Sequence, residues 1–170
     1  NDLAVESEIA YAKLSGEEIP TQETPSREPD IAFSGFTETE RKVKIRLGQQ
    51  FFRKVIMTSY ASKCCVCGMP IPDLLIASHI IPWADDETLR VNPHNGLCLC
   101  ALHDKGFDRG FFTVSEDYKV VLGQAIGNYL SNSSVNSGFK IYEGQMISLP
   151  DKFVPKQEFL AVHRKKYFLG

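Results

Sequence analysis

The chain has 170 residues, of which 43% are hydrophobic, and this suits one domain large enough to bury a core. No apolar run approaches the roughly 20 residues that a membrane-spanning helix needs, which excludes a helical membrane protein and favours a soluble one. Four of the five cysteines lie in C-x-x-C or C-x-C clusters. Such spacing favours metal binding in a reducing compartment over a disulfide framework, so we expect a cytoplasmic protein.

The net charge of −2 hides an asymmetry along the chain. Residues 1–40 carry ten acidic and two basic residues, a net charge of −8, whereas the rest carries 17 basic and 11 acidic residues, a net charge of +6. Within residues 41–63, seven basic residues occur with no acidic one. An unopposed basic stretch of this kind favours a polyanionic partner.

Residues 1–36 are predicted to be an acidic linker or the end of an upstream domain. Residues 2–14 could form a short helix, but residues 15–37 are rich in Ser, Thr, Pro and Glu, which is typical of a linker. The sequence begins without Met and without a signal segment, so we expect a piece of a longer polypeptide or a processed product.

Residues 37–170 are predicted to form one domain that opens with a long amphipathic helix. Thr37 to Glu40 offer an N-cap and first-turn acids, and apolar residues then repeat at helical spacing to about Tyr60. Gly48, in the middle of this helix, disfavours it slightly, because an interior glycine costs roughly 1 kcal/mol relative to alanine.

Short elements are predicted after this helix. In chain order they are a metal-binding turn at Cys64–Gly68, a strand at Leu74–Ile80, a charged loop at Pro82–Pro93, a strand at Leu97–Leu99, a helix at Leu102–Arg109 that ends at Gly110, a hairpin of Phe111–Val114 and Tyr118–Leu122, a loop at 127–138, and a helix at Gln157–Phe168. This mixture predicts an α+β fold.

Two knuckles in this region have the spacing of a structural zinc site. Each contributes two ligands separated by two residues, so that both side chains converge on one metal: Cys64 with Cys67, and Cys100 with His103. Alternatively, Cys65, Cys98 and Cys100 are simply buried thiols, since Cys is among the most buried residue types. Cys65 and Cys98 fall outside the set, and we expect them in the core.

A second group of polar residues is interleaved with the first. His79 stands where the first predicted strand ends, Asn95 precedes the second strand, and Asp104 and Asp108 share one face of the following helix. Paired carboxylates beside a candidate base suit a hard cation such as Mg²⁺ or Mn²⁺. A structural histidine and a solvated Asp108 paired with Arg109 are the alternatives.

The order of these residues resembles that of the HNH endonucleases, the ββα-metal or His-Me finger class, in their restriction-type branch. The resemblance covers residues 64–114 most densely and is carried by three motifs: Ala77-Ser78-His79-Ile80-Ile81-Pro82-Trp83, Asn95-Gly96-Leu97, and His103-Asp104-Lys105-Gly106-Phe107-Asp108-Arg109-Gly110. It implies a ββα-metal finger core with zinc knuckles, flanked by an N-terminal long helix and a C-terminal hairpin plus helix.

The resemblance also implies roles for residues. His79 corresponds to the general base, Asn95 would hold its imidazole, and Asp104 and Asp108 would bind a catalytic Mg²⁺ or Mn²⁺. Ser78 departs from the family, because its position often holds a metal-binding Asp or His, and Asp104 replaces the third His. Candidate phosphate contacts are Lys105, Arg109 and Arg90, together with Arg46 and Arg53 of the basic helix.

The function implied is a divalent-metal-dependent endonuclease that acts on double-stranded DNA, within a restriction or defence protein whose specificity domain lies upstream. A homodimer would be the simplest way to cut both strands. The alternative is a zinc-stabilised nucleic-acid-binding module that has lost catalysis.

Overall fold

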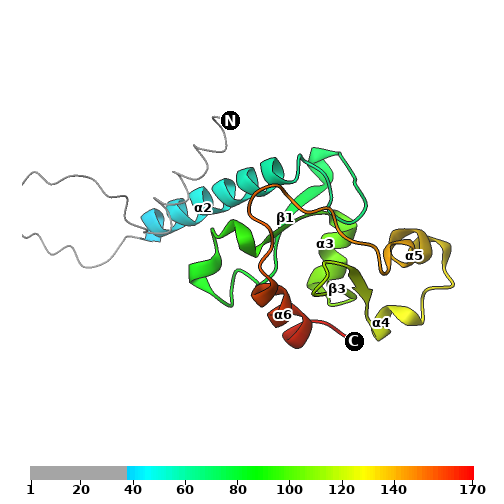
Figure 1. The fold of residues 1–170 in the computed structure, drawn as a ribbon. Coiled ribbons are helices and arrows are strands. Elements are labelled where there is room, and N and C mark those ends of the chain that lie inside the picture. Colours follow the sequence, from blue (N-terminus) through cyan, green and yellow to red (C-terminus); the bar gives the residue numbers. More distant parts are fainter. Residues whose placement is uncertain (1–37) are drawn as a thin grey trace, which may run out of the picture.

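The computed structural model describes residues 38–170 (Figure 1). The predicted linker at 1–36 and the predicted helix at 2–14 lie outside the described residues. Within 38–170, no helix is long and apolar enough to cross a membrane.

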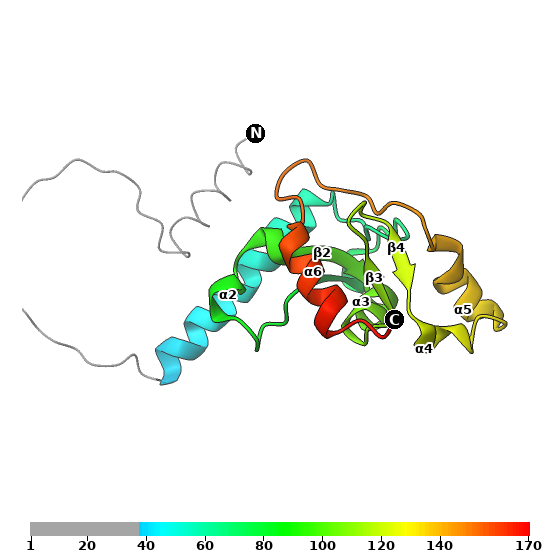
Figure 2. The same cartoon turned by 60° about the horizontal axis from the view of Figure 1, so that its bottom comes forward.

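Helix α2 spans Glu38–Ser59, which confirms the long helix predicted after Thr37. Its C-terminal half is packed, and Phe52 and Ile56 are buried there. Its N-terminal turns project beyond the rest of the described chain (Figure 2), where Val43 and Leu47 are 51% and 54% exposed. Gly48 is buried, and a Cβ at this position would lie 3.1 Å from Cγ1 of Val91. The interior glycine therefore permits the loop that contains Val91 to approach α2 closely.

The centre of the fold is an antiparallel hairpin followed directly by a helix. Strand β1 spans Leu75–His79, strand β2 spans Gly96–Cys100, and helix α3 spans Ala101–Asp108. In this hairpin His79 is opposite Gly96. Both helices contact both strands, with α2 and α3 on either side of the hairpin (Figures 1 and 2). The predicted ββα order is therefore present.

The two faces of the hairpin hold different side chains. His79 stacks on Phe52 of α2, and Cys98 Sγ lies 3.7 Å from Met57 Sδ of the same helix. Side chains alternate along a strand, so Ser78 points to the opposite face, the one on the side of α3.

Helix α3 ends at Asp108, and Gly110 closes its last turn, as predicted. The N–H of Gly110 donates to the carbonyl of Phe107 at 2.9 Å, and the N–H of Phe111 donates to the carbonyl of Gly106 at 2.9 Å. These two bonds are a Schellman motif, and they require a left-handed residue, which Gly110 supplies with φ of 70°. A Cβ there would also lie 2.1 Å from the carbonyl oxygen of Tyr167.

The C-terminal part contains the predicted hairpin and helix. Strands β3 (Phe112–Val114) and β4 (Val120–Leu122) pair antiparallel, and helix α6 (Gln157–Lys166) packs on β3. The fold is thus α+β, with two small sheets. The predicted loop at 127–138 is wrong in part, because helix α4 (Gln124–Gly127) runs into it and helix α5 (Ser133–Gly138) lies inside it.

Helix α5 was not predicted because Asn and Ser are typical of both loops and helix caps. The side chain of Asn132 accepts hydrogen bonds from the N–H groups of Ser134 and Val135, at 2.9 and 3.3 Å, and so begins the helix. Four short 3₁₀ turns complete the described chain: Pro72–Leu74, Glu87–Leu89, Pro93–Asn95 and Lys140–Tyr142.

Candidate functional site

Four side chains meet at the junction of the turn after α2 with β2 and α3. They are the ones predicted from the two knuckles, Cys64, Cys67, Cys100 and His103, and their ligand atoms all lie within 4.8 Å of one another. His103 Nδ1 is 3.6 Å from Cys64 Sγ and 3.2 Å from Cys100 Sγ, and the Sγ atoms of Cys67 and Cys100 are 3.8 Å apart.

These separations fit a tetrahedral metal. With ordinary zinc bond lengths, the edges of the tetrahedron are about 3.8 Å between two sulfurs and about 3.6 Å between sulfur and nitrogen. Three thiols and one imidazole that fill all four positions are typical of a structural site, which leaves no position open for substrate. The donor set could therefore hold a zinc ion.

The ring of His103 is oriented from its other side. Its Nε2 lies 2.9 Å from the carbonyl oxygen of Gly138, which can only accept, so Nε2 carries the proton and Nδ1 presents its lone pair to the thiols. Three aromatic rings meet His103 edge-on, those of Phe112, Phe139 and Tyr142, at 5.9, 5.6 and 5.4 Å between centroids. The candidate metal centre is thus enclosed by the segment that contains α5.

The thiols of this region differ in their ease of ionisation. Burial raises the pKa of Cys64, but the contact with the His103 side chain and hydrogen bonds from backbone N–H groups outweigh it and bring the pKa to about 6. Burial raises the pKa of Cys65 well above its ordinary value and that of Cys98 to about 12. Cys65 and Cys98 are core residues, 2% and 0% exposed, as expected.

His79 is half-buried at the end of β1, with one ring nitrogen engaged and the other available. Its Nε2 lies 2.9 Å from the carbonyl oxygen of Arg90, which assigns the proton to Nε2 and the lone pair to Nδ1. Burial lowers the pKa of His79 below its ordinary value, against the opposing effect of the Arg90 carbonyl. A neutral imidazole with a free lone pair at neutral pH can accept a proton.

Asn95 is fully buried beside the same strand. Its Oδ1 accepts from the N–H of Ile81 at 2.8 Å, its Nδ2 donates to the carbonyls of Ile81 and Leu89 at 3.1 and 3.4 Å, and its own carbonyl accepts from the N–H of Ile80 at 2.9 Å. We expected Asn95 to hold the imidazole. In the described hydrogen bonds it instead fixes the backbone immediately after His79, so its effect on the ring is indirect.

Asp104 and Asp108 lie one turn apart on α3, half-buried and exposed respectively. Partial desolvation of its carboxyl group and the neighbouring charge of Asp104 raise the pKa of Asp108, with Lys105 and Arg109 opposing. In the part of the chain that the structure describes, the Cys3His group alone brings three or more His, Cys, Asp or Glu ligand atoms together. The carboxylate pair is therefore a partial site, to which the substrate or waters must add ligands.

Ser78, on the face of the hairpin that lies toward α3, has an unsatisfied hydroxyl. The residue is 3% exposed, and its Oγ is the one buried side-chain N or O atom among the described residues without a hydrogen-bond partner. A buried orphan hydroxyl costs free energy, so it calls for an explanation such as a bound water or ion.

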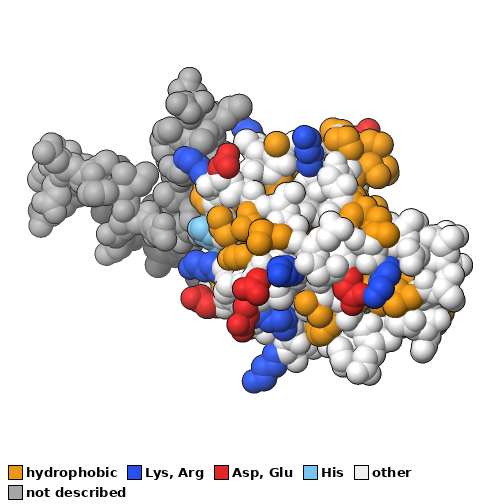
Figure 3. Space-filling view, turned by 45° about the vertical axis from the view of Figure 1, so that its right-hand side comes forward, with side chains coloured by type: hydrophobic (Ala, Val, Ile, Leu, Met, Phe, Trp, Pro, Cys, Tyr) orange, Lys and Arg blue, Asp and Glu red, His pale blue; other side chains and the backbone are white. Residues whose placement is uncertain are grey.

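The five predicted phosphate contacts fall into two groups, those whose side chains bond to other parts of the protein and those whose side chains are exposed. Arg53 donates to the carbonyls of Leu75 and Pro72 at 2.8 and 3.2 Å, fastening α2 to the start of β1. The remaining exposed members are Arg46, Lys105 and Arg109. Basic and acidic side chains are mixed on the face drawn in Figure 3, so a uniformly basic surface is not what this face presents.

Arg90 holds the loop that leads from His79 to Asn95. Its Nε donates to the carbonyl of Trp83 at 3.0 Å, its guanidinium lies 5.1 Å from the centre of the Trp83 ring, and its Nη2 pairs with Glu87 at 2.9 Å. Asp85 of the same loop accepts hydrogen bonds from Lys166 and Tyr167 at the end of the chain. The contacts with Trp83 and Glu87 thus give Arg90 a structural role.

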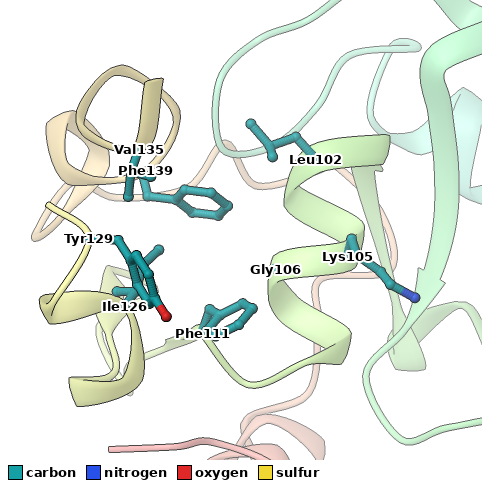
Figure 4. A pocket seen from close by; sticks show the side chains of 8 residues that line it. All are labelled: Leu102, Lys105, Gly106, Phe111, Ile126, Tyr129, Val135 and Phe139. Carbon is teal, nitrogen blue, oxygen red and sulfur yellow. The ribbon is translucent and has the colours of Figure 1, made fainter. Parts of the chain in front are cut away.

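An apolar pocket of about 250 Å³ lies on the side of α3 that faces α4 and α5. Its walls include Phe111, Tyr129 and Phe139 (Figure 4). Lys105 contributes its aliphatic stem, and its amine points away from the aromatic side chains. The candidate base and the candidate zinc ligands are not among the lining residues, so this pocket is separate from both groups.

Two residues that sequence reasoning did not assign to the site touch it. Phe52 stacks on His79, and Trp83 meets the same ring edge-on at 5.5 Å. In the sequence Phe52 showed only helical apolar spacing, which cannot distinguish a core residue from a contact of the base. His163 is 2% exposed, stacks on Phe107 and bonds to Thr113, so it is a core residue.

Among solved structures, the chain is similar to a protein titled "Modification dependent TagI restriction endonuclease", with 21% sequence identity and a TM-score of 0.44. The similarity covers 66% of this chain and 36% of that one, so the matched part is about a third of that protein's length. No curated protein sequence matches the chain. A family model described as HNH endonuclease matches residues 64–115, the segment with both knuckles, His79, Asn95 and α3, and this segment belongs to the HNH endonuclease family.

Proposed function

We propose that the chain is a divalent-metal-dependent endonuclease that hydrolyses phosphodiester bonds of DNA, as the nuclease part of a restriction-type protein. The observation that carries this proposal is the state of His79 within an HNH segment. Its Nε2 is committed to the carbonyl of Arg90, and its Nδ1 is left free to act as a base.

His79 would activate the attacking water. The Nδ1 lone pair takes a proton from water as the oxygen attacks phosphorus and the bond to the leaving oxygen breaks. Burial lowers the pKa of His79, which keeps the ring neutral near pH 7. Asn95 keeps the backbone after His79 in place, so the base meets the water in one geometry.

Asp104 and Asp108 would hold the catalytic Mg²⁺ or Mn²⁺. The repulsion between them, which contributes to the raised pKa of Asp108, is what a bound divalent cation would relieve. When bound, such an ion supplies charge stabilisation at the phosphoryl and leaving oxygens. The orphan hydroxyl of Ser78, on the face of the hairpin toward α3, would be a further oxygen donor for this ion, directly or through water.

Cys64, Cys67, Cys100 and His103 would hold a structural Zn²⁺. All four coordination positions are taken by protein atoms, so this ion has no catalytic role. It would fix the start of α3, where His103 and Asp104 are adjacent. Zinc contributes roughly 10 kcal/mol or more to small metal-dependent folds, so its loss should loosen the carboxylate pair as well.

Double-stranded DNA is the proposed substrate because the chain is basic beyond residue 40 and because its motifs resemble the restriction-type branch. Exposed Arg46, Lys105 and Arg109 are the proposed phosphate contacts. We place sequence or base specificity in an upstream domain, double-strand cutting in a homodimer, and the protein in the cytoplasm.

The test is nicking of supercoiled plasmid with Mg²⁺ or Mn²⁺, with EDTA added, and with His79→Ala. The expected result is metal-dependent nicking that EDTA abolishes and that His79→Ala lowers by about 10² or more. His94→Ala is the matched control, since His94 lies close by in the chain but bonds to the carbonyl of Val154. It should retain most activity.

The same assay separates the enzyme from a non-catalytic zinc-stabilised module. That alternative is favoured by the incomplete carboxylate site, in which three ligands do not converge. A wild-type protein that binds DNA but nicks it with neither metal would support the module. Equal nicking by wild type and His79→Ala would remove His79 from the mechanism.

A further inference from the structure

The imidazole of His79 lies flat against a ring from a different part of the chain. The ring centroids of Phe52 and His79 are 3.9 Å apart, and their planes differ by 12°. Trp83 meets the same imidazole edge-on at 5.5 Å and 85°. In the described ring contacts these are the two partners of His79, and Phe52 is the one that covers a face.

Phe52 is itself held in one place. It is 2% exposed, and its ring tip lies over Gly96, the residue opposite His79 in the hairpin. A Cβ at Gly96 would lie 2.8 Å from Cζ of Phe52 and 2.3 Å from Cδ1 of Ile56. The glycine of the Asn95-Gly96 step therefore leaves the space that α2 fills, and this space adjoins the candidate base.

Two contacts are needed to aim the free nitrogen of His79. The hydrogen bond from Nε2 to the carbonyl of Arg90 fixes one point of the ring but permits rotation about the line of that bond. The last torsion of a histidine side chain has broad minima, so the plane of the ring is otherwise weakly defined. The stacked face of Phe52 removes that freedom.

We propose that Phe52 is a positioning residue for His79, which holds the plane of the imidazole so that Nδ1 points in one direction, and that Gly96 is the residue that admits it. This inference rests on the proposed role of His79 as the base. Phe52 touches no reacting atom in this scheme and acts through His79 alone.

The stack also suits the change of charge during the reaction. When Nδ1 takes a proton the ring becomes an imidazolium, and the negative face of a phenyl ring attracts a cation placed over it. Phe52 thus supports both the orientation of the neutral base and the protonated ring that follows. A leucine of similar apolarity would supply neither effect.

A first experiment reads the ring of His79 without any need for nuclease activity. In wild-type protein, proton and nitrogen NMR of the His79 ring should show contacts to Phe52, upfield shifts from the stacked phenyl, and one tautomer with the proton on Nε2. Absence of these contacts in the folded wild type would overturn the proposal, whether or not the protein is a nuclease.

The second experiment compares Phe52→Leu with Phe51→Leu, the half-buried neighbour on α2. We expect Phe52→Leu to lose the upfield shift and to lower kcat for plasmid nicking by about 10-fold to 10²-fold, with DNA affinity changed less than about threefold. Phe51→Leu should leave kcat within about threefold of wild type. Phe52→Met, which keeps volume but has no flat face, repeats the test if Phe52→Leu does not fold.

Chemical rescue sharpens the result. Free imidazole should restore part of the activity of His79→Ala, because the platform of Phe52 remains, and should restore about tenfold less in the double variant with Phe52→Leu. Equal rescue in both, or a folded Phe52→Leu with wild-type kcat, would show that Phe52 only fills the core. If the wild type fails to nick DNA but shows the NMR signature, then the proposed nuclease function is wrong, whereas the orientation of the His79 ring by Phe52 stands.

Discussion

His103 and Gly138 are joined by a hydrogen bond of 2.9 Å from Nε2 to the carbonyl oxygen, across 35 residues of sequence. The bond sets the tautomer of the imidazole and thereby turns Nδ1 toward the three thiols. It also ties the end of α5 to the candidate zinc centre. The candidate zinc centre is thus bonded to the α5 segment, which contains none of its ligand residues.

Loss of one zinc ligand should remove the metal and destabilise the domain. We expect Cys67→Ser to reduce bound zinc from about one per chain to below half, and to lower the free energy of unfolding by several kcal/mol. Cys98→Ala is the control, since Cys98 is a cysteine of β2 that lies in the core and outside the ligand group. It should lose stability while keeping its zinc, and metal analysis with urea unfolding separates the two effects. Fresh wild-type protein with less than half an equivalent of zinc would contradict the assignment.

Gly96→Ala should destabilise the domain because the added methyl group meets the side chains of Ile56 and Phe52. Overpacking of this kind costs about 1–3 kcal/mol, measured as a shift of the urea midpoint. Gly127→Ala is the matched control: a Cβ there meets nothing within 4 Å, and the residue ends α4. It should be neutral or stabilising by up to about 1 kcal/mol. Equal effects of the two variants would contradict the packing argument.

The sequence predicted the elements whose signals are local. The Cys64 and Cys100 knuckles carry their ligand spacing within four residues, and the structure brings both together. Gly110 closes the last turn of α3 where a left-handed residue was required. Helix α5 was missed because its capping residue, Asn132, is also a typical loop residue.

What the sequence could not supply are the contacts made across long separations. Phe52 and His79 are 27 residues apart and meet only because α2 packs on the hairpin. Arg53 and Arg90 have the charge of phosphate contacts, but their guanidinium groups bond to groups of the protein itself. Charge can be read from a sequence, whereas the partner of a long side chain depends on tertiary packing.

Arg46 and Arg53 should therefore respond differently to replacement by alanine. Arg46 is exposed on the projecting part of α2, so Arg46→Ala should weaken DNA binding and reduce the slope of log affinity against log salt by about 1, with stability unchanged. Arg53→Ala should cost about 1–3 kcal/mol of stability, because it removes the bonds to Leu75 and Pro72. Binding isotherms at several salt concentrations, paired with urea unfolding, measure both. A reversed pattern would show that Arg53 is the phosphate contact.

Stability should fall as the pH is lowered because of His163. Burial lowers its pKa to about 4, so the folded state keeps the ring neutral where the unfolded chain, with a pKa near 6.5, takes up a proton. The stabilisation is complete above about pH 6.5, is lost progressively between pH 6.5 and 4, and amounts to a few kcal/mol. Replacement by Gln removes the titration, so the unfolding free energy of His163→Gln should be lower at pH 7 but depend less on pH over this range. Parallel pH profiles for the two proteins would contradict this account.

The carboxylate pair on α3 provides the sharpest test of the catalytic ion. Asp104→Asn and Asp108→Asn should each raise the Mn²⁺ concentration that gives half-maximal nicking by about tenfold or more, equal to about 1.4 kcal/mol of binding free energy. Asp117→Asn, in the exposed turn between β3 and β4, is the control and should leave that concentration unchanged. Calorimetric titration with Mn²⁺ reports binding independently of turnover. If both helix variants bind and use Mn²⁺ as the wild type does, then the ion lies elsewhere, and the raised pKa of Asp108 reflects only partial desolvation and the charge of Asp104. If both variants lose the binding and the use of Mn²⁺, then His103 belongs to the zinc centre and Asp104 to the site of the catalytic ion, although the two residues are neighbours in the first turn of one helix.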